Sequence, residues 1–113
     1  MASRNSLLAA PPHAVEAALK RLGANLRTAR TRRKLTVAEV AEKIGTGPRA
    51  VMDAEKGQPS SSIAIYAALL WAYDLIGQLD EVADPLRDER GQALALLNEP
   101  KRARKPAGLS NDF

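Results

Sequence analysis

Two short helical patterns joined by a glycine-containing turn fill residues 36–56, and no other feature limits the possible folds as strongly. Thr36 and Glu39 have the spacing of a capping box, in which each side chain satisfies a backbone N–H group at the start of a helix. The apolar residues that follow occupy one helical face, at i, i+3, i+4 and i+7: Val37, Val40, Ala41 and Ile44. The pattern predicts a helix that begins at Val37.

A second short helix is expected directly after the turn. Gly45 should end the first helix, because glycine tolerates the left-handed conformation that a tight turn needs. Pro48 suits the first turn of the next helix, where its missing N–H group costs little. This second helix should bury Val51 and Ala54 and end before Gly57.

Two helices that cross over a turn of three or four residues form the helix-turn-helix of DNA-binding proteins. The residues that carry this pattern are Leu35, Thr36, Ala41, Ile44, Gly45, Val51, Glu55, Lys56 and Gly57. Over about residues 22–75 they resemble the Xre/Cro-like family of bacterial and phage repressors. The resemblance implies an all-α fold: a compact five-helix repressor-like helix-turn-helix domain with a short C-terminal helical extension and a flexible tail. A helical hairpin in an unrelated small bundle is the alternative. Ala54 stands where the family usually has a larger apolar residue, and Val37 replaces a glutamine that many members carry.

Further helices are expected on both sides of the motif. An amphipathic helix from His13 to Arg33 should turn the following side chains inward: Val15, Leu19, Leu22, Leu26 and Ala29. Gly23 should cost this helix about 1 kcal/mol without ending it. Ser62 should cap a helix that runs to about Leu75 and buries Ile63, Tyr66, Ala67, Leu70 and Tyr73. A weaker helix is expected over residues 87–97.

These patterns divide the chain into four segments. We predict a flexible N-terminal arm at 1–12, a DNA-binding domain at 13–76, a dimerisation or partner-binding extension at 77–98, and a basic disordered tail at 99–113. Residues 1–60 carry eleven Lys/Arg against five Asp/Glu, whereas residues 61–100 carry two against seven. The basic half favours a polyanion such as DNA, and the acidic segment should point away from it.

Basic residues crowd the end of the first long helix, directly before the motif. This position favours a clamp on DNA phosphates over a solvated charged face. Helix N-termini also bind anions through their free N–H groups. The expected phosphate contacts are Arg27, Arg30, Arg33, Lys34, Thr36, Thr46, Gly47 and Lys56.

The second helix of the motif should expose the residues that read bases. Arg49 is the strongest candidate, because a guanidinium group can bind guanine O6 and N7 together. Met52 is expected to meet a thymine methyl group. Asp53 should accept from cytosine N4 or orient Arg49.

Apolar residues at 76–97 exceed what the domain must bury, which favours a two-fold homodimer on an inverted-repeat operator of double-stranded DNA. Packing of an extra helix within the chain is the alternative. Trp71 lies off the predicted stripe and is either part of the core or part of a partner surface. In the basic tail, Phe113 is a candidate partner anchor, unless the tail only aids solubility.

Two short C-terminal motifs resemble the HipB-like subgroup of these regulators. They are Ala83, Asp84 and Pro85, and Pro100, Lys101 and Arg102 together with the ending at Phe113. The resemblance implies an antitoxin that represses its own operon and inhibits a HipA-like kinase toxin. A stand-alone repressor and a pure protein-interaction module are the alternatives.

Catalytic, metal and membrane functions find little support in the composition. With no cysteine, one histidine and no phosphate-binding glycine loop, the chain offers no constellation for nucleophilic, metal or phosphoryl chemistry, so we expect no enzyme activity and no cofactor. No run of eighteen apolar residues is present. We therefore expect a cytoplasmic, nucleoid-associated protein.

Overall fold

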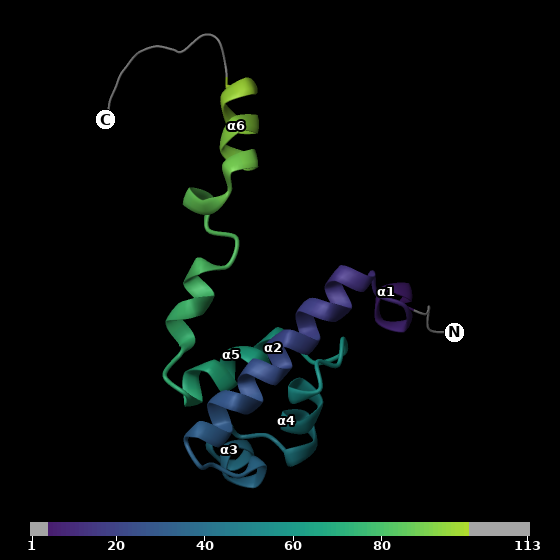
Figure 1. Cartoon of the computed structure of the whole chain (residues 1–113), viewed down its shortest axis with the longest axis vertical. Coiled ribbons are helices and arrows are strands. Elements are labelled where there is room, and N and C mark those ends of the chain that lie inside the picture. Colours follow the sequence, from purple (N-terminus) through teal and green to yellow (C-terminus); the bar gives the residue numbers. More distant parts are fainter. Residues whose placement is uncertain (1–4, 100–113) are drawn as a thin grey trace. The chain divides into compact units, whose positions relative to one another are not determined.

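The computed structural model describes residues 5–99, and every regular element in that range is helical (Figure 1). The all-α class is confirmed. The elements are α1 (Ser6–Ala9), α2 (His13–Arg32), α3 (Val37–Ile44), α4 (Pro48–Glu55), α5 (Ile63–Ala72), the 3-10 helices η1 (Ile76–Glu81) and η2 (Pro85–Arg87), and α6 (Glu89–Leu97). Internal contacts divide the chain into two compact units, residues 1–79 and 80–113.

The start of α3 is capped as predicted. The backbone N–H of Glu39 donates to Thr36 Oγ1 at 3.0 Å, and the backbone N–H of Thr36 donates to Glu39 Oε1 at 2.8 Å. Gly45 ends the helix with a φ of +82°, and its N–H donates to the carbonyl of Ala41 at 2.9 Å. Pro48 then occupies the first turn of α4. Local sequence signals therefore determine both ends of the turn.

The core of the first unit lies where α2, α3, α4 and α5 meet. Val40, Val51, Ala54 and Leu69 are each fully buried there. Between residues 13 and 76 the structure has four α-helices, and the fifth helical element is the 3-10 helix η1. Since Ala54 is small, the corner that it occupies is filled by the close approach of α2.

Two glycines permit that close approach. A Cβ atom on Gly23 would lie 2.5 Å from the carbonyl oxygen of Glu55 and 2.6 Å from that of Ala54. Gly57 has a φ of +72°, and a Cβ atom there would lie 2.6 Å from the carbonyl oxygen of Leu19. The helix α2 continues through Gly23 as predicted, and the missing side chain of Gly23 has a use that was not predicted: it lets α2 touch the end of α4.

The face that α5 buries differs from the predicted one. Ile63 is 70% exposed, whereas Leu69, which we had not expected inside, is fully buried. The helix also ends at Ala72 instead of near Leu75. Because almost every residue of α5 is apolar, periodicity could not single out one inward stripe, and Ile63 lies in the first turn beyond the edge of the core.

The predicted N-terminal arm contains a short helix. Asn5 caps α1, and its Oδ1 accepts from the backbone N–H of Leu7 at 3.0 Å. None of the four residues of α1 is buried. Residues 1–4 of the arm lie outside the described residues.

The second unit has little internal packing. Asp88 caps α6 through a 2.9 Å bond from the N–H of Gly91, so the helix begins at Glu89, two residues later than predicted. Gln92 Nε2 donates to the carbonyl of Pro85 at 2.9 Å and joins α6 to η2. No residue of η2 or α6 is buried, and the predicted tail after Glu99 lies outside the described residues. The boundary between the units follows Leu79, three residues beyond the predicted end of the domain.

Candidate nucleic-acid interface

The outer face of α4 carries the residues that we expected to read bases. Val51 and Ala54 turn inward, which leaves Arg49, Met52 and Lys56 exposed on the other side. The side chain of Arg49 is 85% exposed and extends from the first turn of the helix. This arrangement is that of a helix whose N-terminal half can enter the DNA major groove.

Arg49 and Asp53 form a loose pair on this face. Arg49 Nε lies 3.8 Å from Asp53 Oδ1, one helical turn away. Exposed pairs at this spacing contribute only about 0.3–0.5 kcal/mol. Asp53 can therefore orient the guanidinium group without preventing it from moving to a base.

A shallow pocket of about 270 Å³ adjoins this face, and α2, α3 and α4 all contribute to it. Its apolar part comes from Val37 and Met52, and Arg27 and Lys56 supply positive charge. A contact of Val37 at this surface was not predicted. Val37 lies beside Met52 only because α3 and α4 cross, and the residues near Val37 in the sequence do not indicate this.

Arg30 was expected to contact phosphate, and its geometry contradicts this. Its Nε and Nη2 donate to the two carboxylate oxygens of Glu55 at 2.6 and 3.0 Å, and Nη1 donates to the carbonyl of Leu35 at 2.9 Å. The side chains of Arg30 and Glu55 are only 12% and 8% exposed. The hydrogen bond to Glu55 is the main reason that the pKa of Arg30 is raised above its ordinary value. Arg30 thus fixes the end of α4 against α2 and against the entry to α3.

Arg33 also has partners within the fold, but they use only two of its five N–H donors, so its predicted phosphate contact stays a prediction. Its Nη1 and Nη2 donate at 2.9 Å to the carbonyl oxygens of Ala29 and Tyr73, and its guanidinium carbon lies 5.6 Å from the centre of the Tyr73 ring. Burial is the main cause that raises the pKa of Tyr73 to about 12. Arg33 therefore joins the end of α2 to the end of α5.

Comparison with known proteins shows to which protein family this arrangement of helices belongs. The family model described as a helix-turn-helix domain matches residues 21–84, more than half of the 113 residues. The chain belongs to the helix-turn-helix domain family. No curated protein and no solved structure matches it significantly.

As a helix-turn-helix protein, the chain is a DNA-binding regulator, and α3 and α4 are the two helices of the motif. Among the described residues, no helix is both long and apolar enough to cross a membrane. The match covers α4 and the whole of α5, and it ends within the second unit.

Other predicted phosphate contacts of this helix-turn-helix protein lie near the motif. Gly47 precedes α4 and provides no side-chain cap, so no capping side chain occupies the N–H groups of the first turn. Thr36 accepts the capping bond, while its hydroxyl hydrogen can still donate to a phosphate oxygen. Lys34 is exposed, and its backbone has a φ of +56°, a conformation that residues other than glycine seldom adopt. Thr46, in the turn, is half-buried.

Of the two predicted partner-binding residues, the structure describes Trp71 but not Phe113. Trp71 is 53% exposed on α5, and Lys43 Nζ lies 5.8 Å from the centre of its ring. Trp71 is thus a surface residue beside α3, which leaves its partner role a prediction. Phe113 lies outside the described residues.

Proposed function

We propose that this DNA-binding regulator is a sequence-specific transcriptional repressor that binds an inverted-repeat operator as a homodimer. The observation that supports this most is the outward face of α4, where Arg49 projects from the first turn with 85% of its side chain exposed. Exposure at this point matters because the first residues of a recognition helix reach base edges. The proposal assigns the chain no catalytic role and no cofactor.

In this proposal, specificity and affinity come from different residues. Arg49 binds guanine O6 and N7, Met52 meets a thymine methyl group, and Asp53 orients Arg49 or accepts from cytosine N4. Affinity comes from cations, hydroxyl groups and backbone N–H groups around α4 that the fold leaves available: Arg27, Lys34, Thr36, Thr46, Gly47 and Lys56. Arg30 holds α4 against α2, whereas Arg33 joins α2 to the end of α5.

Two-fold symmetry sets the form of the operator. Two α4 helices should enter the major groove about 34–36 Å apart, because half-sites one helical turn apart lie on the same side of the duplex. A repressor of this kind acts by occupying its operator and excluding the transcription machinery. Operators selected from random DNA should therefore contain inverted repeats.

Arg49→Ala should weaken binding to the selected operator by about 1–3 kcal/mol and relax the preference at one position in each half-site. The reason is that a bidentate guanine contact is lost while the phosphate contacts remain. The measurement is fluorescence anisotropy on the selected operator and on single-base variants, repeated across salt concentrations.

Lys56→Ala provides the matched comparison, because Lys56 is an exposed cation at the C-cap of the same helix. It should weaken binding to all sequences alike and reduce the salt slope by about one. If Arg49→Ala lowers affinity without changing any base preference, the proposed reader is wrong. If binding does not depend on salt, the phosphate contacts are wrong.

A second candidate function, an antitoxin that inhibits a HipA-like kinase toxin, is supported by the surface of the second unit. Leu86 and Leu97 are 83% and 80% exposed, and Val82 and Leu96 are exposed as well. A run of exposed apolar side chains is typical of a surface that a protein partner covers. The same residues serve homodimerisation in the main proposal.

Deleting residues 99–113 separates the two functions. If the basic tail binds a kinase toxin, the deletion should abolish co-purification with the co-expressed toxin while operator affinity stays within about twofold, since the motif is intact. A loss of operator affinity on deletion would instead make the tail a DNA-binding arm. Full retention of the toxin complex would exclude the tail from the partner interface.

A further inference from the structure

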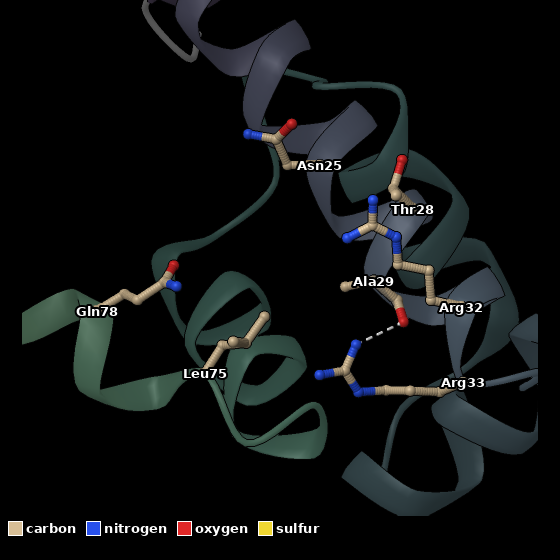
Figure 2. A pocket seen from close by; sticks show the side chains of 7 residues that line it. All are labelled: Asn25, Thr28, Ala29, Arg32, Arg33, Leu75 and Gln78. Carbon is tan, nitrogen blue, oxygen red and sulfur yellow. Dashed lines mark hydrogen bonds between the residues drawn. The ribbon is translucent and has the colours of Figure 1, made fainter.

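On the side of α2 that faces away from α4, a pocket of about 440 Å³ lies between α2 and the segment that follows α5. In Figure 2 the side chain of Arg33 extends across the pocket toward Leu75, whereas the guanidinium group of Arg32 lies on the side of Thr28 and Asn25. Gly23 marks the side of α2 that touches α4. At 3.6 residues per turn, Asn25 and Arg32 lie roughly 180–200° around the helix from Gly23.

The polar groups of this pocket are mainly hydrogen-bond donors. Arg32 and Arg33 supply two guanidinium groups, and Asn25 and Gln78 add side-chain amides. No Asp or Glu lines the pocket, and no carboxylate of the described residues pairs with Arg32. Positive charge without an internal counterion favours a negatively charged occupant.

Arg33 is already held in place for such a ligand. Its bonds to the carbonyls of Ala29 and Tyr73 use two of its five N–H donors (Figure 2 draws the first of these bonds). Its position over the Tyr73 ring restrains the side chain further. Binding therefore does not require ordering this side chain, which is a cost that a free surface arginine would add.

We infer that this pocket binds a small anionic molecule, one that bears a phosphate or carboxylate group. Arg32 and Arg33 hold the anionic group in charge-assisted hydrogen bonds, and the amides of Asn25 and Gln78 orient it. The side chains of Ala29 and Leu75 contact an apolar part of the ligand. The volume suits a small molecule, and the site faces away from α4, so occupancy does not depend on the proposed DNA contacts.

The ligand joins two parts of the first unit. Asn25 and Arg32 belong to α2 and Arg33 is its C-cap, whereas Leu75 and Gln78 lie just before the boundary with the second unit. An occupant that binds only the folded chain stabilises it by mass action. The small anion would therefore bind the regulator at a surface separate from the one proposed to bind DNA.

The test is an NMR titration of the full ¹⁵N-labelled chain with inorganic phosphate, with citrate, and with sodium chloride at matched ionic strength. Saturable shifts of the side-chain amide signals of Asn25 and Gln78 are expected with phosphate or citrate but not with chloride. Saturation by phosphate alone identifies a phosphate-bearing ligand, and saturation by citrate alone identifies a carboxylate. If neither anion shifts these signals beyond the chloride control, the inference is overturned.

Two substitutions test whether the anion binds in this pocket. Arg32→Gln should weaken binding of the active anion about tenfold or more, the loss expected for one charge-assisted hydrogen bond. Arg21→Gln removes an exposed arginine from the same helix outside the pocket and should leave binding unchanged. Equal affinities for the two variants, or shifts confined to α4, would exclude this pocket. Operator binding by Arg32→Gln should stay normal, so failure here does not affect the repressor proposal.

Discussion

Glu55→Gln is expected to lower the free energy of unfolding by about 3 kcal/mol, because removing one partner of a buried ion pair leaves the other charge uncompensated. Arg30 lies 2.6 Å from Glu55 and would keep its charge at a site where its side chain is only 12% exposed. Glutamine preserves the shape of the side chain, so packing changes little. Urea unfolding followed by circular dichroism measures the difference.

Asp53→Asn is the matched control for this prediction. It also removes one carboxylate charge from α4, but the pair with Arg49 is exposed and 3.8 Å long, so the loss should stay below about 0.5 kcal/mol. If the two variants lost equal stability, the Arg30–Glu55 pair would have no special role. Adding Arg30→Met to Glu55→Gln should recover part of the loss, since no buried charge then remains.

Gly57→Ala is expected to cost about 3 kcal/mol for two separate reasons. The backbone there has a φ of +72°, which penalises any residue with a Cβ atom by about 1–2 kcal/mol. The new methyl group would also lie 2.6 Å from the carbonyl oxygen of Leu19, and such overpacking costs about 1–3 kcal/mol. The helices α2 and α4 would have to separate, which thermal unfolding would detect.

Gly45→Ala separates these two contributions. Gly45 has a similar φ of +82°, but no atom lies within 4 Å of the position that a Cβ atom would take. Only the backbone penalty of about 1 kcal/mol should apply. If Gly57→Ala and Gly45→Ala were equally destabilising, the close approach of α2 to the loop after α4 would not contribute to stability.

The parts of the fold that the sequence predicted depend on neighbouring residues. The capping box of Thr36 and Glu39 and the turn at Gly45 follow from groups only a few positions apart, so their spacing alone is informative. The inward positions of α4 followed in the same way, since Arg49 and Asp53 lie on one side of the helix and Val51 and Ala54 on the other. The exposed set on that helix was correct for this reason.

The parts that could not be predicted depend on residues far apart in the chain. Arg30 and Glu55 are separated by 25 positions, and Arg33 and Tyr73 by 40, so nothing local distinguishes these arginines from free surface cations. The role of Gly23 could not be predicted either, because the carbonyl groups that leave no room for a side chain there belong to the end of another helix, α4. A charge cluster therefore predicted a basic region correctly, but not which of its members the fold itself uses.

The close contact at Gly23 and Gly57 anchors α4 by its inner side and its last turn, whereas Arg49 and Met52 occupy the opposite side. The atoms that hold α4 in place are thus separate from the atoms that we propose to read bases. A change at Arg49 leaves the buried core and the Arg30–Glu55 ion pair intact, because the side chain of Arg49 is 85% exposed. If the proposed function holds, this separation makes the scaffold suitable for retargeting, because new operator preferences can be selected at Arg49 without redesigning the protein that presents it.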